Sequence, residues 1–189
     1  MSSKLKTSLR QVIEFLEEKD YSYAIIGGIA LSHWGVVRTT YDIDIKLMVP
    51  DNDYQTVRID LQQAFPQAAR VELPPNPLIV AVSVDDVVVD FLLALPGYEE
   101  LIIDRAVELD LGGWSAWVST AEDLIIQKVV AGRTKDWQDI EELLVEQAGL
   151  LETEYIEEWL HQFGEALDNP DLFDTYRNVV NRVESELTR

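Results

Sequence analysis

The 189-residue sequence contains no cysteine and only two histidines, His33 and His161. The missing thiols exclude disulfides, thiolate metal sites and iron–sulfur clusters, and two histidines disfavour a histidine-built zinc site. No apolar run approaches the roughly 18 residues that a membrane-spanning helix needs. The basic segment 1–10 precedes a helix that carries acids, not an apolar stretch with a cleavage site. We therefore expect no signal peptide, no membrane association and a cytoplasmic protein.

Positive charge is also scarce, with 15 Lys and Arg residues against 35 Asp and Glu residues, a formal net charge of −20. Because phosphate backbones are bound by clustered Lys and Arg, this balance disfavours a general nucleic-acid binder. The acids concentrate in the second half, where 12 of them lie between Asp139 and Asp174, both included, with no intervening Lys or Arg. Such a run is typical of a solvated helical face; a docking surface for a basic partner protein is the alternative.

The apolar pattern predicts an α/β region followed by a region of helices alone. Helices are expected at 4–18, 27–34, 53–64 and 99–106, and strands at 23–26, 41–49, 79–84, 87–93, 107–111 and 114–118. The segment 73–77 is predicted as a loop, and residues 85–86 as the turn of a hairpin. Further helices are expected at 119–131, 135–147, 152–164 and 170–187. The first of these begins with a predicted capping box of Ser119 and Glu122 and ends at Gly132. We predict two domains, residues 1–118 and 119–189.

Two aspartates, Asp42 and Asp44, alternate with isoleucines on a predicted strand. Side chains of a strand alternate between its faces, so both carboxylates project from the same face. Two negative charges held this close repel each other unless a cation is bound between them. Oxygen ligands of this kind suit Mg²⁺, Mn²⁺ or Ca²⁺, whereas an ordinary exposed strand can also carry acids at every second residue.

Three neighbouring features favour the metal interpretation. Gly27 and Gly28 follow an apolar strand and let the backbone approach a phosphate. Arg38 and Thr40 precede the aspartates and could contact phosphate oxygens. Asp90 interrupts the apolar strand 87–93, where an ionised acid is costly unless it is paired or bound to a metal. A buried salt bridge or an edge strand is the alternative for Asp90.

The Gly27-Gly28 pair, the following thirteen residues and the Asp42-Ile43-Asp44-Ile45 strand resemble the signature of the DNA polymerase β-like nucleotidyltransferase superfamily. The segment 38–44 and the later segments 123–128 and 131–140 are similar to the bacterial group that includes abortive-infection nucleotidyltransferase toxins. The resemblance covers about residues 20 to 145. It implies an α/β (α+β) fold with a small, mixed and largely antiparallel sheet, flanking helices and a C-terminal helical region.

The resemblance also implies a mechanism, in which a nucleoside monophosphate moves from an NTP such as ATP to a hydroxyl acceptor with release of pyrophosphate. Asp42, Asp44 and Asp90 would hold Mg²⁺ or Mn²⁺, and Asp90 would draw the proton from the acceptor. Phosphate binding would fall to the backbone amides of Gly27 and Gly28 and to the side chains of Arg38, Thr40 and Lys128. Asp136 would support the site. Lys135 and Asp139 are i,i+4 neighbours, a spacing that favours an ion pair on the helix surface.

The acceptor stays open at this point: tRNA, a protein or a small molecule such as an aminoglycoside-like antibiotic. A toxin of a toxin–antitoxin pair, with a basic antitoxin-like partner, is one expectation for the group. A non-catalytic nucleotide-binding or partner-docking module with the same fold is the alternative, although all three expected carboxylates are present.

Overall fold

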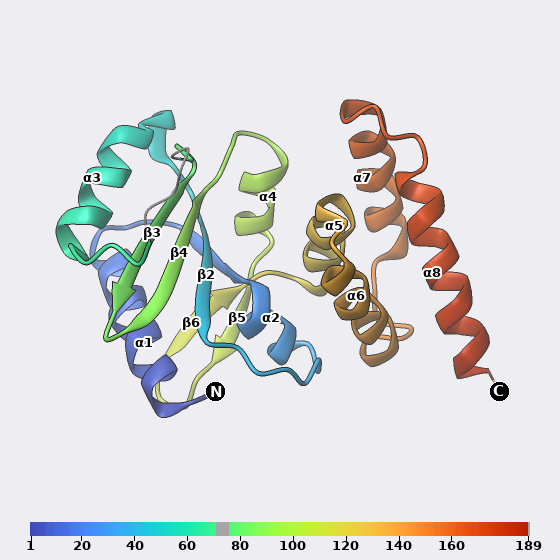
Figure 1. Cartoon of the computed structure of the whole chain (residues 1–189), viewed down its shortest axis with the longest axis horizontal. Coiled ribbons are helices and arrows are strands. Elements are labelled where there is room, and N and C mark those ends of the chain that lie inside the picture. Colours follow the sequence, from blue (N-terminus) through green and yellow to red (C-terminus); the bar gives the residue numbers. More distant parts are fainter. Residues whose placement is uncertain (71–75, 189) are drawn as a thin grey trace. The chain divides into compact units, whose positions relative to one another are not determined.

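The computed structural model of the chain describes residues 1–70 and 76–188 (Figure 1). The chain divides into two compact units. The first, which we call the α/β unit, comprises Met1–Ala30 and Arg38–Ser119; the second, the helical unit, comprises Leu31–Val37 and Thr120–Arg189. The domain boundary after residue 118 remains a prediction, because the division into compact units does not test independent folding. Among the described residues, no helix is both long and apolar enough to cross a membrane.

The α/β unit is built on a six-stranded sheet in the order β3-β4-β2-β1-β6-β5. The strands are β1 (Tyr23–Ile26), β2 (Asp42–Leu47), β3 (Ile79–Val84), β4 (Val87–Leu93), β5 (Val107–Asp110) and β6 (Ser115–Val118). The pairs β1–β2, β3–β4 and β5–β6 are antiparallel, whereas β2–β4 and β1–β6 are parallel. This mixed, mainly antiparallel arrangement confirms the predicted fold class.

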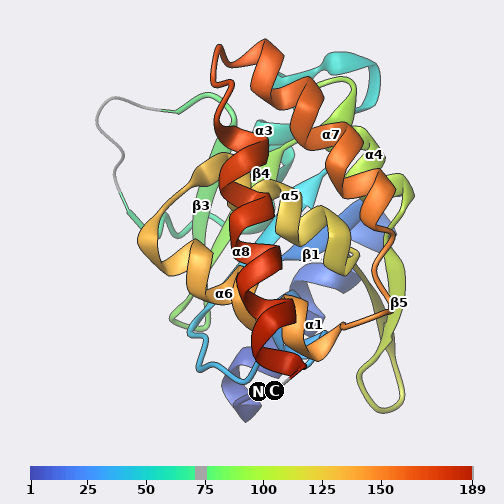
Figure 2. The same ribbon diagram turned by 90° about the vertical axis from the view of Figure 1, so that its right-hand side faces the viewer.

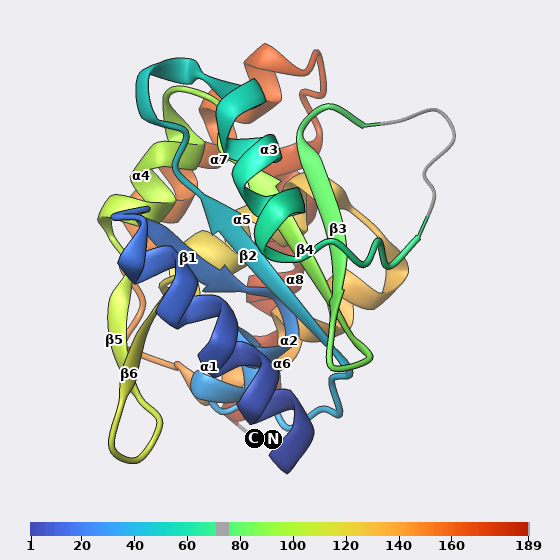
Figure 3. The same ribbon diagram turned by 90° about the vertical axis from the view of Figure 1, so that its left-hand side faces the viewer.

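One face of this sheet is covered by the helices α1 (Ser3–Glu18) and α3 (Tyr54–Ala64), as Figure 3 shows. The covered face carries the apolar residues of the central strands, among them Ile43, Ile45 and Phe91, all fully buried. The remaining elements of the unit are η1 (Pro50–Asn52) and α4 (Tyr98–Asp104). Because side chains alternate along a strand, the polar residues of β2 and β4 project from the opposite face.

The hairpin predicted around residues 85–86 is confirmed, since β3 and β4 pair without a gap up to Val84 and Val87. Asp85 and Asp86 both adopt positive φ angles, 50° and 56°, as a tight two-residue hairpin turn requires. Of the predicted loop 73–77, residues 73–75 lie outside the described residues, and 76–77 precede β3.

The helical unit contains α5 (Ala121–Ala131), α6 (Thr134–Glu146), α7 (Thr153–Ala166) and α8 (Leu172–Leu187), which Figure 2 shows face-on. Helix α5 packs against the other three, so that Ile125 and Ile126 are fully buried. The short helix α2 (Gly27–His33) begins in the α/β unit and ends in the helical unit.

The predicted capping box at the start of α5 is wrong by one residue. Thr120 is the N-cap, and its hydroxyl accepts a hydrogen bond of 3.2 Å from the backbone N–H of Asp123. Ser119 instead continues the sheet, because its N–H donates to the carbonyl of Ile25. The end of α5 is as predicted, with Gly132 in the left-handed conformation at φ 62°.

Candidate active site

The three predicted metal ligands share one face of the sheet. Strands β2 and β4 are parallel neighbours, and their register places Asp44 directly opposite Asp90. Asp42 lies two residues before Asp44, on the same side of β2. Asp42 is exposed, while Asp44 and Asp90 are partly buried. The structure therefore places the carboxylates that the sequence pattern singled out on one face of two neighbouring strands.

Asp90 has a partner that the sequence did not reveal. Nη2 of Arg70 donates a 2.8 Å hydrogen bond to Oδ2 of Asp90, and the two side chains form an ion pair. The Asp90 side chain is only 14% exposed, whereas that of Arg70 is 45% exposed. The other carboxylate oxygen, Oδ1, is buried and has no hydrogen-bond partner within the described part of the chain. One half of this carboxylate is thus satisfied by a cation and the other half is left for a ligand.

Asp42 is oriented by Thr40, whose hydroxyl donates a 2.8 Å hydrogen bond to Oδ1 of Asp42. Gly27 and Gly28 are required because their backbone lies too close to other side chains to leave room for a Cβ atom. A Cβ atom at Gly27 would lie 2.1 Å from Oδ2 of Asp44, and one at Gly28 would lie 2.6 Å from Oγ1 of Thr40. Gly27 also has φ 63°, which an L side chain rarely adopts. The glycine backbone therefore lies directly against two of the predicted site residues.

The donor set fits a hard divalent cation, because all three side chains supply carboxylate oxygens. The buried, unpartnered Oδ1 of Asp90 points to the same conclusion, since an isolated carboxylate oxygen is costly to bury. Across residues 1–70 and 76–188, no three His, Asp or Glu side chains are grouped closely enough to form a complete metal site. Arg70 supplies at Asp90 the positive charge that a metal ion would otherwise supply.

A second buried cation, Lys46, continues the polar face of β2 beyond Asp44. Its side chain is 5% exposed and its Nζ lies 2.5 Å from Oε1 of Glu99 on α4. The other oxygen of Glu99 accepts a hydrogen bond from the N–H of Leu95. The alternation of Asp42, Asp44 and Lys46 indicates that Lys46 lies on the same face as the aspartates, but its buried partner Glu99 lies 53 residues later in the chain. This pair ties α4 to the strand that carries the aspartates.

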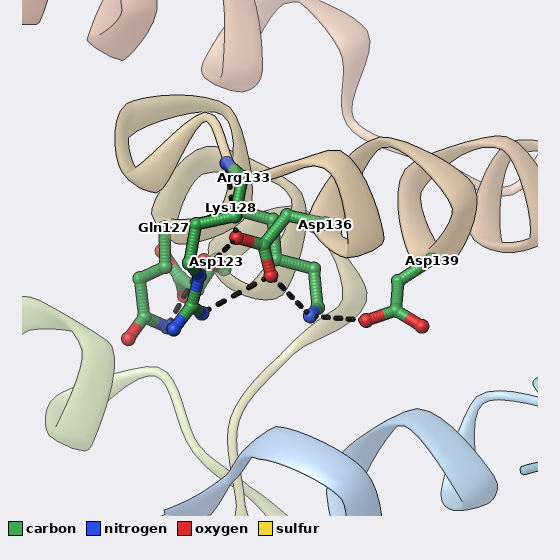
Figure 4. Close-up of polar contacts among 6 residues, drawn as sticks. All are labelled: Asp123, Gln127, Lys128, Arg133, Asp136 and Asp139. Carbon is green, nitrogen blue, oxygen red and sulfur yellow. Dashed lines mark hydrogen bonds and ion pairs between the residues drawn. The ribbon is translucent and has the colours of Figure 1, made fainter.

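Lys128 and Asp136 come together in the helical unit (Figure 4). Nζ of Lys128, on α5, lies 3.3 Å from Oδ1 of Asp136 and 2.6 Å from Oδ2 of Asp139, both on α6. Arg133 adds a third contact, with Nε 2.6 Å from Oδ2 of Asp136. Asp139 therefore pairs with Lys128 of the neighbouring helix instead of with Lys135 of its own helix, which is exposed. The cluster joins α5 to α6.

The carboxylate of Asp136 is fully buried. Burial alone disfavours its charged form, but hydrogen bonds and charge from Arg133 and Lys128 outweigh that effect, so the pKa of Asp136 lies below its ordinary value. At the start of α5, Asp123 is also fully buried and accepts hydrogen bonds from Thr120 and from the Tyr155 hydroxyl, at 2.9 and 2.8 Å. The carboxylates of Asp136 and Asp123 thus already have hydrogen-bond partners within the protein.

Three solved structures share this fold. An antigenic nucleotidyltransferase-like protein from Paracoccidioides brasiliensis is 17% identical, with a TM-score of 0.57 and 93% of each chain covered. ANT(2″)-Ia in complex with adenylyl-2″-tobramycin is 16% identical, with a TM-score of 0.59 over 87% of this chain and 99% of that chain. The solution structure of the antibiotic-resistance factor ANT(2″)-Ia is 14% identical, with a TM-score of 0.58 over 100% of this chain and 99% of that chain. At these identities the similarity shows the fold.

None of the curated proteins is similar enough in sequence to count as a match. The family of the chain is nevertheless defined by its sequence. Residues 3–185, which include both units almost completely, match the family described as "Nucleotidyltransferase of unknown function (DUF6036)". The carboxylate face and the fold agree with this match, and the chain belongs to that nucleotidyltransferase family.

Proposed function

We propose that this nucleotidyltransferase transfers a nucleoside monophosphate from an NTP to a hydroxyl group of a small molecule, with release of pyrophosphate and with Mg²⁺ or Mn²⁺ as cofactor. The observation that carries the proposal is the register of β2 and β4, which sets Asp44 opposite Asp90 with Asp42 on the same face. A divalent cation held by these carboxylates would neutralise charge on the triphosphate and on the leaving pyrophosphate.

We assign separate roles to the side chains in metal binding, phosphate binding and proton transfer. Asp42 and Asp44 bind the cation, and Thr40 keeps Asp42 in place through its hydrogen bond. The bare backbone at Gly27 and Gly28 leaves room for phosphate oxygens, and exposed Arg38 contributes positive charge to them. Oδ1 of Asp90 accepts the proton of the acceptor hydroxyl. The acceptor oxygen then bonds to the α-phosphorus as the bond from that phosphorus to the bridging oxygen breaks.

Lys128 and Asp136 take a supporting role in this proposal. Two carboxylates already neutralise Lys128, and the cluster joins α5 to α6. We therefore assign to both residues the positioning of the helices rather than chemistry on the substrate. Loss of Lys128 should lower stability and activity in parallel.

A small hydroxyl acceptor is favoured over a long nucleic acid by charge. The chain has a net charge of −20, which repels polyanions. One protein of the same fold was solved with adenylyl-2″-tobramycin, a small molecule that carries a transferred nucleotide. A neutral or cationic acceptor of that size suits an acidic surface better than tRNA does.

The proposal is tested by incubating the protein with each α-labelled NTP and Mg²⁺ or Mn²⁺, and with aminoglycosides, tRNA or a cell lysate as acceptors. We expect label on a small hydroxyl compound and none after chelation of the metal. The double variant Asp42→Asn/Asp44→Asn should abolish transfer, a loss of at least about a thousandfold. Asp51→Asn, the same type of substitution at one exposed turn residue, should leave transfer unchanged.

Other outcomes separate the alternatives. Label on tRNA or on a protein would contradict the small-molecule acceptor and favour the toxin interpretation, in which a basic antitoxin-like partner is expected. Metal-dependent NTP binding in calorimetry, with no transfer to any acceptor, would contradict catalysis and favour a nucleotide-binding module. Absence of metal-dependent NTP binding would overturn the proposal as a whole.

A further inference from the structure

A cleft of about 450 Å³ lies within the α/β unit at the beginning of β1, away from the proposed active site. Its walls come from the end of α1, the turn at residues 20–22, the end of α4 and strand β6. Tyr23 begins β1, whereas Ile26, which pairs with Asp44, ends it. The two places are thus separated by three strand residues, or roughly 10 Å along the strand. The volume lies within the range of small-molecule sites.

Three carboxylates line this cleft, those of Glu17, Asp20 and Asp104. None of them forms an ion pair or a side-chain hydrogen bond with another residue in the described part of the chain. The nearby cation Lys19 pairs instead with Asp60, outside the lining. The cleft therefore carries concentrated negative charge that the protein itself does not compensate.

Tyr23 provides an independent sign of a ligand. Tyr23 lines the cleft, the residue is only 3% exposed, and its hydroxyl oxygen has no hydrogen-bond partner among the described residues. Burial raises the pKa of Tyr23 to about 12; the Trp117 backbone lowers it and the charge of Glu17 raises it. A buried hydroxyl beside an uncompensated carboxylate is a ready acceptor for an N–H donor.

The walls also favour an organic cation over a metal ion. The acids of the cleft are not grouped closely enough to ligate one metal ion, as holds for all described residues. Aromatic side chains make up much of the remaining lining, with Trp117 48% exposed and Tyr21 held in place by a 2.9 Å hydrogen bond from its hydroxyl to Asp60. Aromatic faces attract ammonium groups. Separated carboxylates with aromatic walls therefore suit an extended molecule with several ammonium groups.

We infer that this cleft is a binding site for a small aliphatic polyamine, seated between Glu17, Asp20 and Asp104 and donating a hydrogen bond to the hydroxyl oxygen of Tyr23. One ammonium group lies against the face of Trp117 and the others against the carboxylates. Since the site lies apart from the carboxylates of β2 and β4, its occupancy is independent of nucleotide binding and does not rest on the proposed function.

The test is calorimetric titration of the full chain with spermidine, putrescine and butylamine, which carry three, two and one ammonium groups. Affinity should rise with the number of ammonium groups. Glu17→Gln/Asp104→Asn should weaken spermidine binding by about tenfold or more, because the loss of even one of the two charge-assisted hydrogen bonds has an effect of about that size. The control Glu154→Gln/Asp174→Asn removes the same charge from the helical unit and should change affinity by less than about twofold.

Two single variants address the other contacts. Tyr23→Phe removes only the acceptor oxygen, and Trp117→Ala removes the exposed aromatic wall; each should weaken spermidine binding several-fold, with unchanged circular dichroism. Equal weakening by both double variants would show non-specific counterion binding and overturn the site. Absence of saturable binding of spermidine to the wild-type chain, or unchanged affinity in Tyr23→Phe, would overturn it as well.

Discussion

The carboxylates of the α/β unit and those of the helical unit differ in how completely the protein satisfies them. Asp90 has one oxygen on Arg70 and one buried oxygen with no hydrogen-bond partner among the described residues. Asp136, fully buried, is bound by Lys128 and Arg133 and by the backbone N–H of Arg133. A complete set of partners indicates a structural ion cluster, whereas an incomplete set indicates a site for a ligand. The predictions below test this difference from the largest expected effect to the smallest.

The largest effect is expected from Gly27→Ala in the α/β unit. The new Cβ would lie 2.1 Å from Oδ2 of Asp44 at a positive φ angle, so Asp44 must move. Nucleotidyl transfer should fall by at least about a hundredfold, because misplacement by about 1 Å has such effects on catalysis. Gly97→Ala, also at positive φ but with no heavy atom near its Cβ, controls for backbone strain. Equal losses of transfer in both variants would contradict the close approach as the cause.

Lys128→Met should affect the helical unit through stability. Removal of this cation leaves Asp136 with only Arg133 and strips a buried contact from Asp139. We expect the free energy of unfolding in urea to fall by about 3–5 kcal/mol. Lys135→Met, at an exposed position seven residues later, should change it by less than about 0.5 kcal/mol. A small effect of Lys128→Met would mean that the cluster is not structural.

Arg70→Gln tests the incompletely satisfied carboxylate of the α/β unit, Asp90. The variant removes the cation that competes with a metal ion for Asp90. Mn²⁺ binding, followed by electron paramagnetic resonance without nucleotide, should therefore tighten, by up to about fivefold for the loss of one partly exposed ion pair. Arg58→Gln, whose guanidinium binds the carbonyls of Pro77 and Ile79 and no acid, is the matched control. Weaker Mn²⁺ binding in Arg70→Gln would contradict competition.

The smallest effect concerns pH. Because the folded-state pKa of Asp136 is lowered, its ionised form stabilises the fold above its unfolded-state pKa, near 4, and that contribution is lost as the pH falls through the folded value. The stability difference between wild type and Asp136→Asn should thus be constant from pH 7 to pH 5 and shrink below about pH 4. Urea unfolding across this range measures it. A difference that already shrinks between pH 7 and pH 5 would contradict a lowered pKa.

Much of the fold and the carboxylate set could be predicted because their signals are local. Alternation along β2 and the lone acid in β4 identify Asp42, Asp44 and Asp90. Glycine residues next to the strands mark where the strands end. Arg70 could not be found in this way. It lies in an irregular stretch after α3, where no periodicity indicates which acid a basic residue will contact.

The ion-pair partner of Asp139 in the helical unit could not be predicted from the sequence either. Spacing along one helix suggested a pair of Lys135 and Asp139, but Lys128 of α5 takes that place because it is buried between two helices. The one-residue error at the start of α5 has a similar cause. Ser119 could cap a helix by its chemistry, but its N–H is used by the sheet.

The segment Leu31–Val37 gives the chain an interleaved layout. It belongs to the helical unit although the chain before and after it belongs to the α/β unit. Within the helical unit, the carbonyl of Trp34 accepts a hydrogen bond from Gln147, and Gly35 lies against the side chain of Glu146. No single cut of the chain separates the two units: a fragment that ends at residue 118 keeps this segment but loses the residues it packs against. Exchange of either unit by recombination at one point would therefore break a packed contact, so that the carboxylate face and the helices are expected to be inherited together.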